Sequence, residues 1–160
     1  MISKEEIWTA LEEIPDPEIP VISINELGVL REIKKDPSGF VITITPTYSG
    51  CPAMNQIETD IKNKLAELGV KKYSINLQYH PAWTTDWMSA EAKDKLLEYG
   101  ISPPNKSVDK SALLGLKKTP ICPKCKSHNT KMISQFGSTA CKALYQCNDC
   151  LEPYDYFKCI

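Results

Sequence analysis

Long apolar runs and an excess of one charge are both missing from this 160-residue sequence. No stretch of about 18 apolar residues occurs, which excludes a membrane-spanning helix. The first residues are acidic and helical, unlike the basic and apolar start of a signal peptide, so we expect a soluble, cytoplasmic protein without a membrane partner. A net charge of -1, from 19 basic and 20 acidic residues, gives no support to a nucleic-acid binder.

Motifs of common enzyme classes are absent as well. With only seven glycines, the sequence has no glycine-rich phosphate loop, and it contains neither a G-x-S-x-G elbow nor an H-E-x-x-H helix. A thiol enzyme that uses Cys51 as its nucleophile would need a neighbouring base, and none lies next to Cys51 in the sequence.

Cysteine, in contrast, is plentiful and unevenly placed. Six of the seven cysteines lie in the last 39 residues, and in a reducing cytosol such a cluster indicates metal binding or thiol chemistry, because disulfides would not persist there. The distribution of charge also separates this cysteine-rich end from the rest. Residues 1–116 carry 12 basic and 17 acidic groups, whereas residues 117–160 carry 7 basic and 3 acidic groups. We therefore expect two units: a domain over 1–100, a linker over 101–120 and a second domain over 121–160.

The first unit reads as an α/β (α+β) domain of order α-β-β-α-β-α with a mixed sheet. A capping box, Ser3 with Glu6, starts the first helix, and prolines make residues 15–20 a stiff loop. Alternating β-branched residues predict a hairpin, and the helix after it predicts a crossover to a parallel strand. The expected strands cover 28–34, 40–45 and 73–79, and the later helices cover 52–68 and the residues from Ser89 to Tyr99.

Two C-x2-C pairs, Cys122 with Cys125 and Cys147 with Cys150, are separated by 21 residues, close to the spacing of four-cysteine zinc ribbons. A segment of about 40 residues cannot bury a sufficient core, so the metal is expected to be structural. Zinc is favoured because four ligands leave no open position, although four thiolates also accept iron. Cys141 and Cys159 are either further ligands or core residues.

Cys51 differs from the other cysteines because it stands alone at the junction of a strand and a helix. The helix dipole there favours the thiolate, which is the reactive and metal-binding form, although a lone cysteine is as often a small buried apolar residue. Asp16 and Glu18 on the proline-stiffened loop could bind a metal, orient a partner or act as an acid/base pair, while solvated turn residues are the commoner case.

Four segments together resemble the small α/β domain of the iron–sulfur assembly factor family: Asp16-Pro17-Glu18-Ile19-Pro20, Leu27-Gly28-Val29, Thr47-Tyr48-Ser49-Gly50-Cys51-Pro52 and Pro81-Ala82-Trp83-Thr84-Thr85-Asp86-Trp87-Met88. The family's acidic motif falls on Asp16 and Glu18, and its cysteine falls on Cys51 with Thr47 nearby. The resemblance implies a transfer site that could hold iron or an iron–sulfur cluster transiently.

The tail, from the Cys122 pair through Gln135-Phe136-Gly137-Ser138-Thr139-Ala140-Cys141 to Phe157-Lys158-Cys159, is similar to the zinc-ribbon extension of the phenylacetate-degradation D family. The resemblance to that family implies a non-catalytic accessory subunit of the phenylacetyl-CoA epoxidase, which assists metal or cluster assembly in a partner such as the reductase. The iron–sulfur assembly machinery is a further partner that the resemblance implies. The alternative is a stoichiometric structural or electron-transfer subunit. A homodimer through the hairpin's edge strand is also compatible with the sequence.

Overall fold

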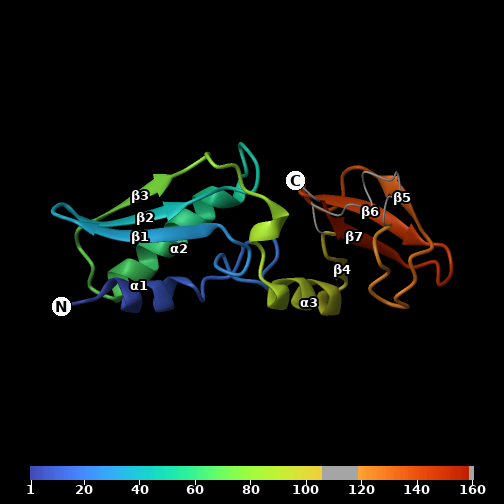
Figure 1. The fold of residues 1–160 in the computed structure, drawn as a ribbon, viewed down its shortest axis with the longest axis horizontal. Helices are drawn as coiled ribbons and strands as arrows, with labels where there is room; N and C mark the ends of the chain where they lie inside the picture. Colours follow the sequence, from blue (N-terminus) through green and yellow to red (C-terminus); the bar gives the residue numbers. More distant parts are fainter. Residues whose placement is uncertain (106–118, 159–160) are drawn as a thin grey trace. The chain divides into compact units, whose positions relative to one another are not determined.

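The computed structural model describes residues 1–105 and 119–158, and its contacts divide the chain into two units, Met1–Trp83 and Thr84–Ile160. Each unit has its own β-sheet, of order β1-β2-β3 in the first and β4-β7-β6-β5 in the second (Figure 1). The fold class predicted from the sequence, a mixed α/β domain followed by a ribbon, is confirmed. Within the described residues, no helix has the length and apolar character needed to cross a membrane.

The first unit begins at the predicted capping box. The Ser3 hydroxyl accepts a hydrogen bond from the Glu6 N–H at 3.1 Å, and the Glu6 carboxylate accepts one from the Ser3 N–H at 2.8 Å, which satisfies two otherwise unpaired donors of α1 (Lys4–Leu11). Strands β1 (Leu30–Asp36) and β2 (Gly39–Ile44) form the antiparallel hairpin. Helix α2 (Ala53–Glu67) then connects β2 to β3 (Tyr73–Leu77), which lies parallel to β2.

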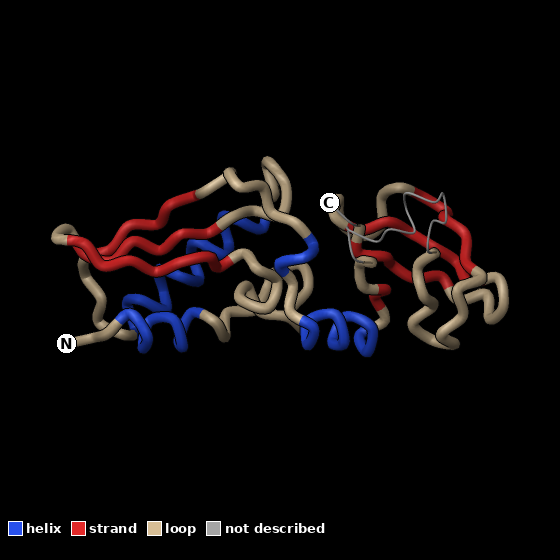
Figure 2. Tube along the Cα trace, in the orientation of Figure 1, coloured by secondary structure: helices blue, strands red, loops and turns tan. Residues whose placement is uncertain are grey.

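Both helices lie on one side of the three-stranded sheet, as the blue helices and red strands of Figure 2 show. The buried face of β2 carries Ile42 and Ile44, both fully buried. Apolar residues one or two turns apart on the helices pack against this face, as the helical period requires. The buried helical residues are Ile7, Leu11, Ile57, Ile61 and Leu65.

The second unit starts with a short 3-10 helix, η1 (Thr85–Trp87), and α3 (Ala90–Tyr99). Ser89 caps α3 as expected, because its hydroxyl accepts the Ala92 N–H at 3.0 Å. Strands β5 (Thr130–Ser134), β6 (Lys142–Cys147) and β7 (Pro153–Phe157) are antiparallel neighbours, and β4 (Ile101–Ser102) pairs parallel with β7.

The division between the units differs from the expected boundary at residue 100. The contacts group α3 with the ribbon, and Ile101 and Ser102, at the start of the expected linker, form strand β4. At the other end of that segment, the carbonyl of Pro120 accepts hydrogen bonds from Tyr154 Oη at 3.3 Å and Thr130 Oγ1 at 3.0 Å. Both ends of the expected linker therefore belong to the second unit, while residues 106–118 lie outside the described residues.

Candidate metal centre and thiol site

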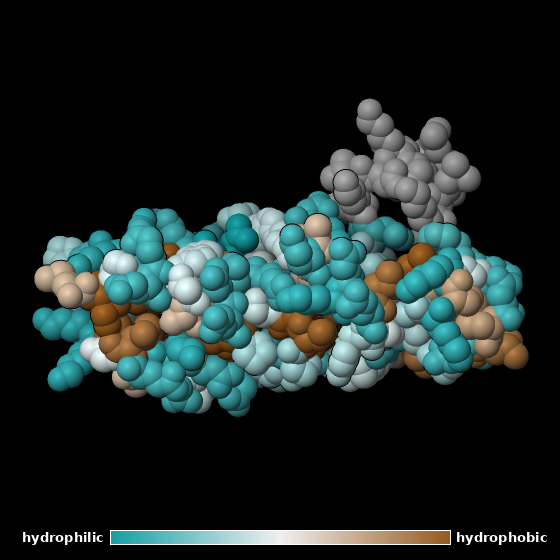
Figure 3. All heavy atoms as spheres, turned by 90° about the horizontal axis from the view of Figure 1, so that it is seen from below, coloured by the Kyte–Doolittle hydropathy of each residue, from teal (hydrophilic) through white to brown (hydrophobic). Residues whose placement is uncertain are grey.

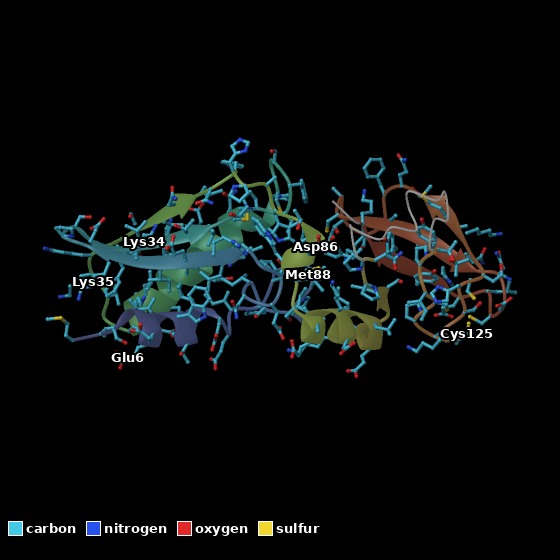
Figure 4. The ribbon with its side chains drawn as sticks, in the orientation of Figure 1. Glu6, Lys34, Lys35, Asp86, Met88 and Cys125 are labelled. Carbon is cyan, nitrogen blue, oxygen red and sulfur yellow. The ribbon has the colours of Figure 1, made fainter. Side chains whose placement is uncertain are left out.

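The two C-x2-C pairs meet in space. Their four sulfur atoms, from Cys122, Cys125, Cys147 and Cys150, all lie within 4.8 Å of one another. Two of the sulfur pairs are 3.7 Å (Cys122 to Cys150) and 3.5 Å (Cys125 to Cys147) apart. A tetrahedron with metal–sulfur bonds of about 2.3 Å has edges of about 3.8 Å, and a disulfide bond is only about 2.05 Å long. The donor set therefore fits a four-thiolate metal centre (Figure 4 labels Cys125).

Each knuckle holds its sulfurs with local backbone groups. The N–H of Cys150 points to the Cys147 sulfur at 3.5 Å, and this contact is the largest cause that lowers the pKa of Cys147, to about 7. The N–H of Ser127 lowers the pKa of Cys125, but desolvation and the neighbouring thiols raise it, to about 12. The Cys125 thiol therefore keeps its proton at neutral pH, and a metal ion that binds here must displace it.

Cys141 does not belong to the four-sulfur group. Its side chain is buried, and its sulfur lies 3.0 Å from the Thr139 hydroxyl. Of the two alternatives for Cys141, ligand or core residue, the structure favours a buried residue outside the four-sulfur group. Cys159, the other cysteine of that expectation, lies outside the described residues.

Cys51 lies just before α2, where β2 has ended, and is half-buried. It lines a cavity of about 440 Å³ between the start of α2 and the end of β3. The wall is mixed in character: Leu77 and Met54 are apolar, and Glu58 supplies a carboxylate seven residues, or two helical turns, after Cys51. The complete lining is Pro46, Gly50, Cys51, Pro52, Met54, Asn55, Glu58, Leu77 and Tyr79.

Glu18 and Thr47, two of the residues carried over from the family motif, act directly on Cys51. Burial raises the pKa of the Cys51 thiol, and the negative charge of Glu18 raises it further. The N–H of Ala53 and the hydroxyls of Tyr48 and Thr47 hydrogen-bond to the sulfur and lower the pKa, without reversing the shift. The direction of the pKa shift is thus opposite to the one expected from the helix start alone, because desolvation and a like charge outweigh the helix terminus.

Asp16 has a different place from Glu18. It is 5% exposed, and its Oδ1 atom accepts the N–H groups of Glu18 and Ile19, each at 2.9 Å. These bonds fix the turn that follows Pro17. Asp16 is not among the groups that shift the Cys51 pKa. Thr47 thus hydrogen-bonds to Cys51 and the charge of Glu18 acts on it, although neither residue lines the cavity. Asp16 orders the loop that bears Glu18.

The sequence reasoning did not single out several residues of this site. Tyr48 hydrogen-bonds to the Cys51 sulfur, and Asn55, Glu58 and Tyr79 line the cavity. The helical period could have found Glu58 from Cys51. Tyr79 could not have been found in this way, because its position beside the cavity depends on the parallel pairing of β3 with β2.

Comparison with known proteins finds relatives of both the first domain and the cysteine-rich ribbon. Residues 4–76 match the iron-sulfur cluster assembly protein family, and residues 106–158 match the PaaD zinc beta ribbon domain. A crystal structure of a domain of unknown function, DUF59, from Bacillus anthracis has a TM-score of 0.54 and 32% identity, over 58% of this chain and 90% of that one. A Porphyromonas gingivalis protein named as an Fe-S protein maturation auxiliary factor is 38% identical over 61% of this chain and 91% of its own length.

These matches define the class as an iron–sulfur cluster assembly domain followed by a zinc ribbon. An Escherichia coli (strain K12) protein, named as the D component of 1,2-phenylacetyl-CoA epoxidase, is 50% identical over 97% of this chain and 92% of its own. The chain belongs to the family of these phenylacetyl-CoA epoxidase D proteins. The resemblance stated from the sequence motifs is confirmed.

Proposed function

We propose that this chain is a non-catalytic accessory protein of the phenylacetyl-CoA epoxidase that assists the assembly of iron or an iron–sulfur cluster in a partner subunit, with the reductase as its client. The names of the relatives support the accessory role, since one is a component of the epoxidase and others are Fe-S protein maturation auxiliary factors. The observation that carries the proposal is the contrast between two sulfur sites of one chain. The ribbon offers four thiols to one ion, whereas the cavity offers Cys51 among oxygen donors.

The working site in this proposal consists of Cys51, Glu18 and Thr47, with Asp16 ordering the loop. One sulfur with carboxylate and hydroxyl oxygens is an incomplete ligand set for iron, which several protein thiolates would bind more strongly. Iron(II) that binds as cargo takes the place of the Cys51 thiol proton, which passes to solvent. When the thiolates of the client replace Cys51 as ligands, its sulfur takes a proton back, and no electron moves in the exchange.

The ribbon has a separate role in the proposal. We assign zinc to the four cysteines Cys122, Cys125, Cys147 and Cys150, because this ion fills a closed tetrahedral thiolate site without redox chemistry. The site then holds the second unit together and does not exchange its metal with a client. Metal analysis of protein purified without oxygen tests this assignment, with one zinc and no iron per chain expected. Stoichiometric iron with acid-labile sulfide would favour the alternative, an electron-transfer subunit.

The test of the transfer role compares Cys51→Ala with Ser49→Ala, which changes an exposed side chain on the same loop. In cells that depend on this chain, we expect Cys51→Ala to lower the iron content and the epoxidase activity of the partner, and Ser49→Ala to leave both unchanged. Matured partner subunits should then work without this chain in vitro. Equal iron content with Cys51→Ala, or a need for the chain in every assay, would contradict the role.

A further inference from the structure

Three exposed apolar side chains gather within five residues of the ribbon. Met132 and Ile133 on β5 are each 52% exposed, and Phe136, just after the strand, is 66% exposed; we call these three residues the β5 patch. Single exposed apolar residues are ordinary on a protein surface, but three large ones within five residues of one another indicate an interaction site. On the face of the molecule seen from below, teal polar atoms cover most of the surface and brown apolar atoms reach it in several separate places (Figure 3).

The patch lies at the edge of its sheet. β5 ends the strand order β4-β7-β6-β5, so within the described residues no further strand pairs with its outer side. The register with β6 shifts between Met132 and Ser134, and such a bulge interrupts the regular edge that another strand would need. The patch is therefore suited to side-chain contacts with a partner rather than to the addition of a strand.

The support beneath Met132 connects it to the metal centre. Met132 is the register partner of Tyr145, whose ring stacks on that of Tyr154 at 6.2 Å between centroids. Tyr154 in turn packs with Cys122 and Cys147 in the buried cluster of the ribbon. A surface backed by a fixed core needs little ordering when it binds, and this lowers the entropic cost of association.

The rim of the patch is cationic. The ammonium group of Lys158 stands 4.8 Å from the centroid of the Phe136 ring and donates to the Gln135 carbonyl at 2.9 Å. Lys131 is exposed on β5 next to Met132. Asp155, which approaches the turn after Phe136, accepts hydrogen bonds from the hydroxyl and N–H of Ser138 at 2.8 and 3.4 Å.

The other carboxylates of the described ribbon also have local partners. Glu152 forms an ion pair with Lys124 at 2.9 Å, and Asp149 accepts from Ser127 and Asn129. Among the described residues neither Lys131 nor Lys158 has a carboxylate partner, although Lys158 contacts the Phe136 ring and the Gln135 carbonyl. An apolar surface with a basic rim is complementary to apolar side chains flanked by carboxylates.

We propose that the β5 patch is the docking surface for an acidic segment of the client subunit, whose apolar side chains cover Met132, Ile133 and Phe136 and whose carboxylates lie against Lys131 and Lys158. The inference rests on the proposed function, because it names how the client of Cys51 is held. It gives the ribbon a task separate from transfer: the ribbon binds the partner, and the first unit serves the metal.

The experiment measures binding of the full chain to the purified apo-reductase subunit by calorimetry. Met132→Ser combined with Phe136→Ser should weaken binding about tenfold or more, as is usual for the central residues of an interface. Lys131→Glu should weaken it more at low salt than at high salt, because salt screens exposed charges. Tyr99→Ser, which changes an exposed aromatic residue of α3 (58% exposed), should bind as the wild type does.

Metal content and the near-ultraviolet signal of the ribbon tyrosines must be unchanged in each variant, and the single charge reversal keeps the test valid if the double variant fails to fold. Wild-type affinity in the patch variants would overturn the proposal. So would a wild-type chain that binds no reductase, or a wild-type dimer that the patch variants dissociate, since the occupant would then be a second copy. Cys51→Ala should bind the reductase normally, so a failure of transfer and a failure of docking are distinguished.

Discussion

Removal of the metal from the four-cysteine site should unfold the ribbon and leave the first unit folded. One buried cluster of the ribbon consists of Cys122, Cys147 and Tyr154, so two of its three members are proposed ligands, while Ala143 and Phe157 are buried elsewhere in the unit. A structural zinc site contributes roughly 10–16 kcal/mol of apparent binding free energy at pH 7, whereas whole domains are stable by only about 5–15 kcal/mol. The free energy lost with the ion is therefore comparable to the whole stability of a domain, and we expect the ribbon to unfold without it.

The assay is an amide correlation spectrum of the full chain before and after chelation under reducing conditions. We expect the signals of β5, β6 and β7 to collapse, those of the first sheet to persist, and zinc to restore the spectrum. Cys125→Ser should weaken metal binding by more than about a hundredfold, since even loss of a partner outside the ligand set costs about 10–100-fold. Cys141→Ser is the matched control and should retain the metal. A chelated chain with an intact ribbon spectrum would refute the reasoning.

Two further predictions concern the first unit. Gly39→Ala places a Cβ 2.2 Å from the Lys72 carbonyl oxygen, at a φ of +136°. Backbone strain of about 1–3 kcal/mol and loss of the Phe40 N–H bond to that oxygen, about 0.5–1.5 kcal/mol, should lower the free energy of unfolding in urea by roughly 2–4 kcal/mol. Gly69→Ala, with a φ of +73° and no atom within 4 Å, should cost about 1 kcal/mol, and equal losses in the two variants would contradict the geometry. Burial and the charge of Glu18 raise the pKa of Cys51, so its alkylation, followed by mass spectrometry, should be slower at pH 8 than that of a free peptide cysteine and should accelerate at higher pH. Glu18→Gln should accelerate the alkylation of Cys51 at pH 8. An unchanged rate in this variant would show that Glu18 does not act on the thiol.

The elements predicted best from the sequence are those specified by short-range chemistry. The Ser3 and Glu6 capping box, the hairpin of β1 and β2 and the parallel crossover to β3 all appear as expected. Each depends on residues close in sequence or on the fixed handedness of a βαβ connection. The spacing of the two C-x2-C pairs likewise predicted that their sulfurs meet.

What the sequence could not supply depends on packing between distant segments. Nothing near Ile101 indicates that it pairs with Asp155 of β7, so residues 101–102 read as linker. The direction of the Cys51 pKa shift could not be predicted for the same reason. The helix start is visible in the local sequence, whereas burial and the charge of Glu18 depend on the fold. The separate roles of Asp16 and Glu18 also required the folded loop, since one carboxylate turns inward to backbone N–H groups.

The raised pKa of Cys51 strengthens the case for transfer rather than storage at this site. A thiol that keeps its proton at neutral pH is a weak nucleophile and oxidises slowly, so the proposed transfer site would be protected as long as no metal is bound. Binding of a cation must then displace that proton, which lowers the net affinity. In the proposed exchange, a client with several thiolates would gain more from the same ion than Cys51 loses, which would favour delivery. In this proposal Glu18 contributes to both binding and release, because its charge would attract the cation and, without a metal, helps to hold the proton on the Cys51 sulfur.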